Sequence, residues 1–430
     1  MSKTDRPDRQ SCQDPTRPTQ RSRRRFLLGA GGLGATTVLA ASGGPFRINI
    51  AAAATPPIPI GFPVPPPGPY ALEAQDQVRC AELAVDQFNA SGGMDGRMAK
   101  LLVRDDMLSP GRAAAVTRTL IAGDQAKYIV GSLSATVQLS VASVAAAREV
   151  VYVSISQSDA INEAPNAGPL TFHEALNPHM TCQAVGNYVF ERHGPRVAYL
   201  VADYTYGHEM ARGMQRAGDA FQAQTVAEVR HPIASQDFTP FLPKIMEARP
   251  DILCLCNFGR DQLYAVRDAT VMGLKDKMRL VAPVLLYQQR LTGGAALFDD
   301  VIGGSNYHWT LEQTVPAAKR FNDAYRARYD RPPSDYGAYG YAGVSALLSA
   351  MRTAGSTDSR TVADTLRTLR YDVCKGQQWY RACDGQSVQS VLVVGSTPEA
   401  KMENPHDIFE VLDTQAADEK FLRSCSELAY

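Results

Sequence analysis

The chain has 430 residues, of which 45% are hydrophobic and 20% are charged, the composition of an ordinary globular protein of two or three domains. Its 44 basic and 44 acidic side chains balance, so it lacks the basic surplus of a nucleic-acid-binding protein. Residues 1–54 hold nine of the basic side chains and three of the acidic ones. The rest of the chain is therefore mildly acidic, which argues against binding to nucleic acid or to anionic lipid.

The first 54 residues have the pattern of an export signal. Residues 22–28 (SRRRFLL) precede a weakly apolar stretch rich in glycine and alanine, and the alanines at 51–54 offer a cleavage site. The paired arginines before Phe26 resemble a bacterial twin-arginine signal, whose partner during export is the twin-arginine translocase. The alternative, a membrane anchor, needs about 20 strongly apolar residues, and four glycines between 29 and 34 interrupt this run. We predict a removable signal peptide at 1–54 and a periplasmic mature protein.

Strands and helices are predicted to alternate along residues 58–154. Ile58, Ile60 and Phe62 alternate as in a strand that neighbouring prolines limit. Apolar residues at 78, 81, 85 and 88 then follow the period of a helix. The same reasoning predicts a strand at 100–106, a helix around 113–120, a strand at 128–131, a helix around 137–144 and a strand at 150–154.

A second run of alternating elements begins at residue 196. It comprises strands at 196–202, 226–231, 251–256 and 279–283, with helices around 210–221, 238–245 and 262–272 between them. Two such runs predict an α/β fold with two doubly wound parallel sheets. Beyond Gly304 we expect helices around 318–325, 344–351 and 361–370, a hairpin between 375 and 385, and a strand at 388–394. The tail beyond Pro398 is polar and has no clear period.

The loops that follow the strands carry the candidate site, because open parallel sheets bind ligands beyond the carboxyl ends of their strands. Ser134 and Thr136 follow a buried strand and begin a helix, where free N–H groups and hydroxyls favour an anion. Residues 154–159 have the same character, and simple helix capping is the alternative for both loops. In the second run, Tyr206 either covers a ligand or is a surface aromatic. Asp261 either faces a ligand ammonium or complements a helix start.

Short stretches from Ile58 to about Gly395 resemble, in order, the leucine/isoleucine/valine-type periplasmic substrate-binding proteins of ABC importers. The matching residues are 60–61 (IG), 68–69 (GP), 81–89 (AELAVDQFN), 92–97 (GGMDGR), 104–106 (RDD), 129–131 (IVG), 206–207 (YG), 236–239 (QDFT) and 324–329 (AYRARY). The resemblance implies a type I periplasmic binding protein, whose two lobes are joined by a three-crossing hinge and close on a small amino acid or amide. It also implies an inner-membrane ABC permease as partner.

The resemblance also assigns roles to individual residues. Ser134, Ala135 and Thr136 resemble the loop that holds the ligand carboxylate, and Ser156 and Ser158 resemble the second loop, which binds carboxylate and ammonium. In a similar way, Tyr206 resembles the aromatic residue of the second lobe, Asp261 falls where members place a glutamate for the ammonium, and Tyr70 lies close to a position that is often aromatic. Gln157 is bulkier than the usual alanine, so the ligand stays open among amino acids, amides and aromatic acids.

The predicted domains follow from the two runs and the later helices. They are the signal peptide at 1–54, lobe one at 56–172 plus 308–371, lobe two at 177–304 plus 372–397, and a C-terminal tail at 398–430. No hydrolase, metalloprotease or phosphate-loop motif is present. The resemblance implies ligand capture for an ABC importer, and the missing motifs lead us to expect no catalysis, cofactor or metal. A periplasmic sensing module and, less favoured, an enzyme acting on a small carboxylate or amide are the alternatives.

Two cysteines flank the predicted hairpin. Cys374 and Cys383 lie on either side of its glycine-containing sequence, and an oxidising periplasm permits a bridge between them. Two buried free thiols are the alternative. The sequence therefore predicts a Cys374–Cys383 disulfide that staples the hairpin.

Overall fold

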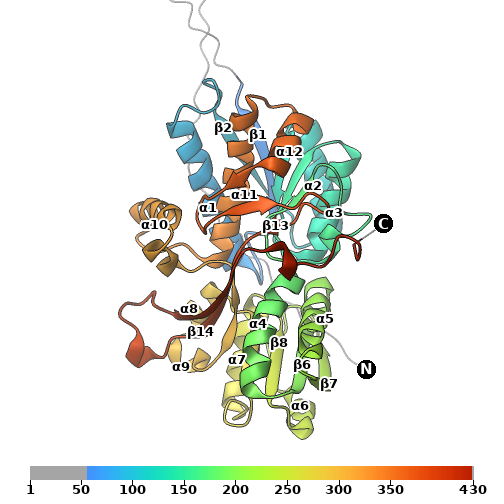
Figure 1. Ribbon diagram of the computed structural model, residues 1–430, viewed down its shortest axis with the longest axis vertical. Helices are drawn as coiled ribbons and strands as arrows, with labels where there is room; N and C mark the ends of the chain where they lie inside the picture. Colours follow the sequence, from blue (N-terminus) through green and yellow to red (C-terminus); the bar gives the residue numbers. More distant parts are fainter. Residues whose placement is uncertain (1–55, 429–430) are drawn as a thin grey trace, which may run out of the picture. The chain divides into compact units, whose positions relative to one another are not determined.

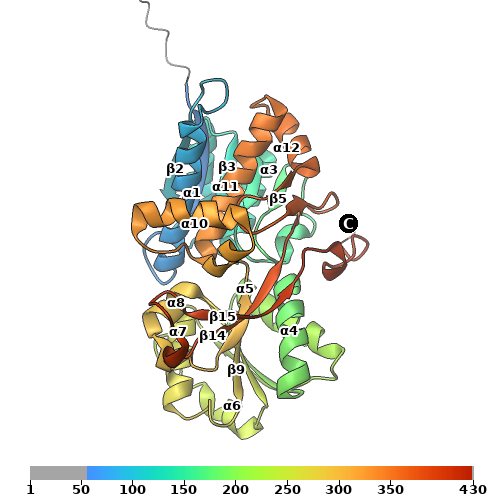
Figure 2. The ribbon, with the colours of Figure 1, turned by 60° about the vertical axis from the view of Figure 1, so that its left-hand side comes forward.

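The first sheet of the computed structural model contains five parallel strands in the order β2-β1-β3-β4-β5, and the structure describes residues 56–428. The strands are β1 (Ile58–Val64), β2 (Ala99–Asp105), β3 (Tyr128–Gly131), β4 (Val151–Ser154) and β5 (Thr171–His173). The helices α1 (Ala71–Ala90), α2 (Pro110–Ala122), α3 (Ala135–Ala147), α11 (Asp335–Ala354) and α12 (Ser359–Thr368) pack with this sheet and with one another (Figures 1 and 2). These elements, called the first lobe below, confirm the predicted first run.

The prolines of β1 limit its pairing on one side only. The Ile58 N–H donates to Met98 O next to β2, so the N–H positions of Pro59, Gly61 and Pro63 face β3. Because proline has no N–H to donate, β1 pairs with β3 at only two positions, against seven with β2. The strand itself lies inside the sheet between β2 and β3, and is not shortened by its prolines.

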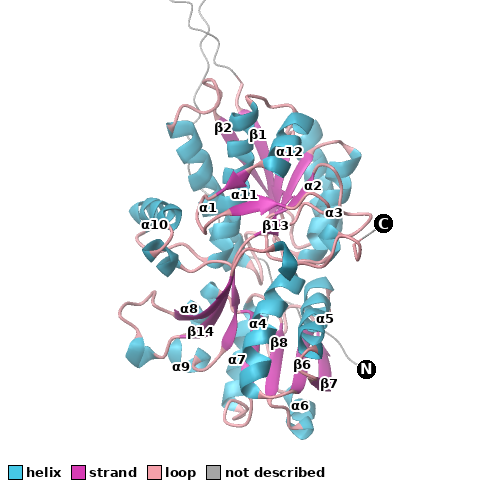
Figure 3. Ribbon diagram, in the orientation of Figure 1, coloured by secondary structure: helices cyan, strands magenta, loops and turns pink. Residues whose placement is uncertain are grey.

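The second sheet has seven strands in the order β15-β14-β10-β9-β8-β6-β7. Figure 3 labels β14, β8, β6 and β7 of this sheet. Its strands are β6 (Arg196–Ala202), β7 (Gln224–His231), β8 (Ile252–Cys256), β9 (Arg279–Val284), β10 (Ile302–Ser305), β14 (Val391–Ser396) and β15 (Phe409–Gln415). The helices of this second lobe are α4 (Pro178–His193), α5 (Thr205–Asp219), α6 (Leu242–Ala248), α7 (Arg260–Val271), α8 (Tyr287–Gly293) and α9 (Ala295–Phe298). Strands β14 and β15 are antiparallel to their neighbours, and the other strands are parallel.

The tail beyond Pro398 contains strand β15, which its sequence pattern does not reveal. Only Phe409 of this strand is buried, and the side chains that follow it are exposed or half-buried. An edge strand with one buried residue has no alternating apolar pattern, so pairing with β14 decides its structure.

The chain passes between the two sheets three times, after β5, after β10 and after a small antiparallel sheet of β11 (Arg370–Tyr371), β12 (Gln378–Tyr380) and β13 (Ser387–Val388). Helix α10 (Pro316–Tyr329) follows the second crossing. The small sheet contacts the first lobe, where the Tyr380 ring lies 5.1 Å from that of Phe172 and Gln386 bridges to His173. The assignment of residues 372–388 to lobe two is therefore wrong, and the third crossing lies between β13 and β14.

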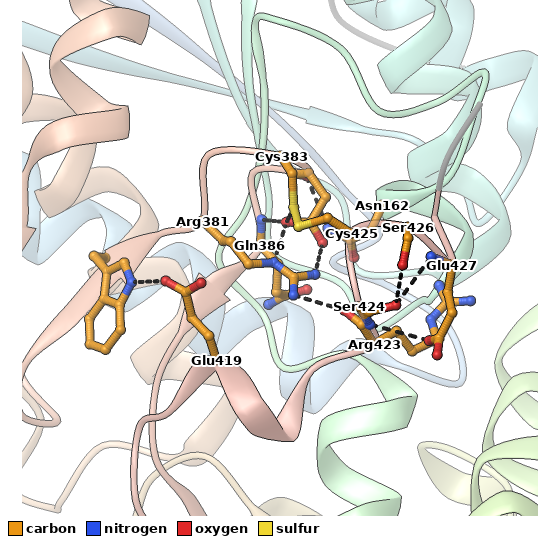
Figure 4. The surroundings of a disulfide bond; sticks show 12 residues. Asn162, Arg381, Cys383, Gln386, Glu419, Arg423, Ser424, Cys425, Ser426 and Glu427 are labelled. Carbon is orange, nitrogen blue, oxygen red and sulfur yellow. Dashed lines mark hydrogen bonds and ion pairs between the residues drawn. A yellow bond between two sulfur atoms is a disulfide. The ribbon is translucent and has the colours of Figure 1, made fainter.

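The predicted Cys374–Cys383 disulfide is also wrong, because Cys383 pairs with Cys425 (Figure 4). Cys374 is a buried free thiol within the first lobe's apolar core. The segment after β15 returns to the hairpin, where the Arg423 carbonyl accepts from Arg381 at 2.8 Å. The Cα atoms of Cys383 and Cys425 lie 6.1 Å apart. The C-terminal segment is thus a fourth, covalent link between the lobes, because β15 pairs within lobe two while Cys425 is held to the hairpin beside lobe one.

The predicted signal peptide, residues 1–54, lies outside the described residues. Among residues 56–428, no helix combines the length and hydropathy that a bilayer crossing requires.

Candidate functional site

An aromatic cluster joins the two lobes where their strand-end loops meet. The Phe258 ring, after β8, lies 4.8 Å from the Tyr70 ring and 5.0 Å from the Tyr336 ring of the first lobe. It also lies 5.5 Å from the ring of Tyr206, at the start of α5. All four side chains are buried. The predicted residues Tyr70 and Tyr206 therefore lie in one cluster, to which Phe258 and Tyr336 are added.

Gly259 allows this close approach of the loops. Its φ is +60°, a left-handed conformation that disfavours any side chain. A Cβ atom there would lie 2.6 Å from the Tyr70 ring and 2.7 Å from Pro69 O. The β8–α7 loop therefore contacts the β1–α1 loop through its backbone.

The two serine- and threonine-rich loops of the first lobe lie together. The Ser156 hydroxyl donates to Leu133 O at 2.7 Å, which links the loop after β4 to the loop after β3. Ser158 Oγ accepts from the Ala160 N–H at 3.1 Å. Ser134 is the N-cap residue of α3, but its side chain makes no capping hydrogen bond, and Ala135 beside it is buried.

Thr136 connects this loop to the second lobe. Its Oγ1 lies 2.9 Å from Thr205 Oγ1 at the start of α5. The starts of helices α3 and α5 are thus in contact. The first N–H groups of any helix have no acceptor within the helix and are free to bind another group. Such helix starts favour an anionic group between the lobes.

Asp261 lies on the second-lobe side and is 1% exposed. Its Oδ2 accepts from the Ala234 N–H at 3.0 Å, while Oδ1 has no hydrogen-bond partner. Burial raises the pKa of Asp261 to about 7, and the Ala234 N–H offsets this only in part. Within residues 56–428, no Lys, Arg or His side chain forms an ion pair with this carboxyl group.

Two further buried acids, which the sequence reasoning did not select, lie on the first-lobe side. Glu73 is fully buried in the first turn of α1 and accepts from Gln289 Nε2 of α8 at 2.7 Å. Burial raises its pKa to about 7. Asp335, at the start of α11, is 2% exposed, and burial raises its pKa to about 8. Like Asp261, both acids lie at the start of a helix, and this position is the sequence feature by which they could have been selected as candidates.

Both lobes contain buried polar side chains that lack a hydrogen-bond partner. Asn257, at the end of β8, is fully buried, and neither its Oδ1 nor its Nδ2 has a hydrogen-bond partner. Gln157 Nε2 lies 3.4 Å from the hydroxyls of Tyr336 and Tyr339, and its Oε1 has no partner. Buried polar atoms are normally paired in folded proteins, so these groups indicate a missing polar partner such as a ligand or water.

Polar contacts also hold the two lobes together at the side of α5. Glu209 accepts from the N–H groups of Asp159 and Ala160, each at 3.1 Å. The Arg216 guanidinium lies 2.9 Å from the Asp159 carboxylate. With the aromatic cluster, these contacts describe a closed arrangement of the two lobes.

Metal ligation finds no support among residues 56–428, where no group of three or more His, Cys, Asp or Glu has a metal-binding arrangement. His173, which is buried, has Nδ1 2.8 Å from Asn162 Oδ1 and Nε2 2.8 Å from Ser156 O. Both ring nitrogens therefore lie within hydrogen-bond distance of protein oxygens.

Comparison with known proteins agrees with this architecture. Leu/Ile/Val-binding protein homolog 2 of Brucella abortus (strain 2308) is 23% identical over 332 residues, covering 72% of this chain and 82% of that protein. A periplasmic binding protein structure from Burkholderia mallei has a TM-score of 0.81 at 24% identity and covers 86% of this chain and 97% of that one. The branched-chain amino acid transporter substrate binding protein of Streptococcus pneumoniae, in complex with isoleucine, has a TM-score of 0.73 at 22% identity, covering 83% and 99%.

At these identities the solved structures establish the fold alone. The periplasmic binding protein family itself matches residues 57–400, most of the chain. The predicted α/β fold with two parallel-dominated sheets is thereby confirmed. The chain belongs to the periplasmic binding protein family and has its type I fold.

Proposed function

We propose that this protein captures a small polar ligand between its lobes and delivers it to an inner-membrane ABC permease, without chemical conversion. The observation that carries the proposal is the set of buried, unpartnered polar atoms enclosed by contacts between the lobes. Glu73 and Gln157 contribute such atoms from the first lobe, and Asn257 and Asp261 from the second. A small ligand with matching polar groups would complete their hydrogen bonds and stabilise the closed state.

The predicted site residues have distinct roles in this proposal. The start of α3, with Ser134, Ala135 and Thr136, receives a carboxylate or another acceptor group of the ligand. Ser156 and Ser158 support that loop, because their hydroxyls already bond within the first lobe. Tyr70 and Tyr206 cover the ligand's apolar part, and Asp261 receives an ammonium or N–H group.

A thermal-shift screen tests ligand capture. The panel contains amino acids, amides and aromatic acids, because the resemblance and Gln157 leave these classes open. A compound at 100 times its Kd should stabilise the protein by about 2.7 kcal/mol. Turnover of a stabilising compound would indicate an enzyme, whereas ligand-stimulated uptake that depends on this protein would distinguish an importer from a sensing module. Stabilisation by none of the three classes would contradict the proposal.

We also propose that residues 1–54 direct the protein to the periplasm through the twin-arginine translocase. The Ser-Arg-Arg-Arg-Phe sequence at 22–26 and the absence of a competing apolar span in the sequence support this address. Replacing both Arg23 and Arg24 by lysine should stop export while the cytoplasmic protein still folds. Continued export of that variant would exclude the twin-arginine route.

A further inference from the structure

Two buried carboxyl groups of the first lobe have no basic partner. Glu73 uses Oε1 to accept from Gln289, while its Oε2 has no hydrogen-bond partner. Asp335 accepts from the Tyr336 N–H through Oδ1 at 2.9 Å, and its Oδ2 is also without a partner. In the described part of the chain, no Lys, Arg or His forms an ion pair with either group.

Asp76, one turn after Glu73 on α1, provides the contrast. It is 1% exposed and pairs with Arg79 at 2.8 Å and with Arg331 at 3.0 Å. It also accepts from the Tyr325 hydroxyl at 3.0 Å. Both acids accept from α8 of the second lobe, Asp76 from Gln288 and Glu73 from Gln289. The fold therefore supplies basic partners to the acid of the second turn and leaves the acid of the first turn without one.

The unpartnered atoms of these buried side chains, near the contact between the lobes, are mostly acceptors. Glu73 Oε2, Asp335 Oδ2, Asp261 Oδ1 and Gln157 Oε1 can only accept while the carboxyls are ionised, whereas donors come from Asn257 Nδ2 and the Tyr70 hydroxyl. A buried acceptor without a donor destabilises the closed protein by about 1–3 kcal/mol. A ligand that completes the hydrogen bonds of the ionised carboxyls therefore brings more N–H donors than acceptors to these side chains.

We propose that the ligand carries a second cationic group, an ammonium or guanidinium separate from any amine near Asp261, which Glu73 and Asp335 receive between the lobes. This inference rests on the proposed ligand-binding function and names the chemistry of the ligand's positive end. Helix α8 of the second lobe supports this location. Its Gln289 side chain donates to Glu73, and the Tyr287 backbone N–H lies near Asp335. Burial raises the pKa values of both carboxyls, and a bound cation beside them would lower these values again.

The experiment compares cationic probes with neutral counterparts of similar size on the full exported protein. L-Arginine is paired with L-citrulline and L-ornithine with L-norvaline, and agmatine is added as a cation without a carboxylate. L-Leucine and benzoate represent ligands without a second positive group. At least one cationic probe should raise the unfolding temperature and bind about tenfold or more tightly than its neutral counterpart.

Variants then connect the effect to the two acids. Glu73→Gln and Asp335→Asn keep the side-chain shape and should each weaken the cationic probe about tenfold or more. Asp268→Asn is the matched control, because Asp268 is a buried acid that already pairs with Arg267 at 2.7 Å and lies on α7 away from these groups. It should leave the affinity for the probe unchanged.

Each outcome decides the inference. Stabilisation by L-leucine or benzoate, with no cationic probe binding, would overturn it while the proposed ligand capture stands. Stabilisation by no compound would count against both proposals. If Glu73→Gln and Asp335→Asn fail to fold, the comparison of L-arginine with L-citrulline on the unmodified protein still decides. Equal affinity for the two would overturn the role of the positive charge.

Discussion

Glu209 of the second lobe accepts a hydrogen bond from the backbone N–H of Ala160 in the first lobe, at 3.1 Å. The same carboxylate accepts from the neighbouring N–H of Asp159 at 3.1 Å, and it is 3% exposed. One side chain thus satisfies two backbone donors across the lobe contact, and the closed state depends on it.

Glu209→Ala should reduce the free energy of unfolding by about 1–3 kcal/mol, because two buried N–H groups lose their acceptor. It should also weaken any ligand that requires closure. Urea unfolding and titration of a ligand identified by the screen measure the two effects. Glu191→Ala is the control: Glu191 pairs with Arg192 at the surface, so the change should stay within about 0.5 kcal/mol. Equal stabilities of the two variants would contradict the role of Glu209.

The ligand-free protein should lose stability as the pH rises from about 6.5 to 8. Burial raises the pKa of Glu73, Asp261 and Glu209 to about 7 and that of Asp335 to about 8. In this window the unfolded carboxyls, with pKa values of about 4, are already ionised. The folded protein therefore binds more protons than the unfolded chain, and stability falls by about 1.4 kcal/mol per pH unit for each such proton.

Buried histidines do not reverse this trend in that window. Burial lowers the pKa of His173 to about 4 and that of His308 to about 3. Their effect on stability increases with pH only up to about 6.5, where the unfolded histidine loses its proton. Urea midpoints at pH 6.5, 7.2 and 8 measure the trend, and a midpoint that rises across this range would refute it.

Removing the Cys383–Cys425 disulfide should destabilise the protein by about 2–4 kcal/mol, because the unfolded chain regains the freedom of the closed loop. Cys425→Ser should show this loss in guanidinium unfolding without reductant. Cys374→Ser is the control, since Cys374 is a free thiol, and it should keep the bridge. Thiol titration of the denatured, unreduced segment from residue 56 should find five thiols. If Cys374→Ser removes the disulfide, the result would support the Cys374–Cys383 pairing and contradict the Cys383–Cys425 pairing.

Gly259→Ala should weaken ligand binding more than it weakens folding. The new Cβ would clash with the Tyr70 ring and Pro69 O of the opposite lobe, and so would favour an open arrangement. Gly294→Ala is the matched control, because Gly294 also has a positive φ, +81°, but no atom lies within 4 Å of its added Cβ. Both variants should lose about 1–2 kcal/mol of stability from backbone strain, and only Gly259→Ala should reduce ligand affinity. A similar affinity for both would argue against the loop contact.

Asp261→Asn should weaken an amino-acid ligand more than about tenfold, because a buried ammonium would lose its charged partner. Thr136→Val should have a smaller effect, since a neutral hydrogen-bond donor contributes about 0.5–1.5 kcal/mol. Calorimetric titration of each variant measures both. If Asp261→Asn leaves the affinity unchanged while Thr136→Val lowers it, the part of the ligand near Asp261 has no amine.

Local pattern was sufficient for the strands and helices of the two predicted runs, but not for β5, α4, β10, α8, α9 and β15. The apolar run at 196–202 predicts β6 with its observed bounds, because a buried parallel strand is recorded in consecutive residues. The loops with Ser134 and Ser156 and the helix start with Tyr206, each of which follows a strand, came from the same pattern. The parallel topology placed them at one edge of each sheet. The order of the matching stretches along the chain was sufficient to predict the family and its fold.

The tertiary structure decided which distant residues meet. Cys425 was not paired with Cys383 in the sequence reasoning because the tail's return depends on the pairing of β15 with β14, a contact that no local period records. Glu73 has the same helix-start position as many solvated acids, and only the approach of Gln289, 216 residues away, encloses it. Burial and pairing depend on such long-range contacts, whereas the period of a strand or helix is a property of neighbouring residues.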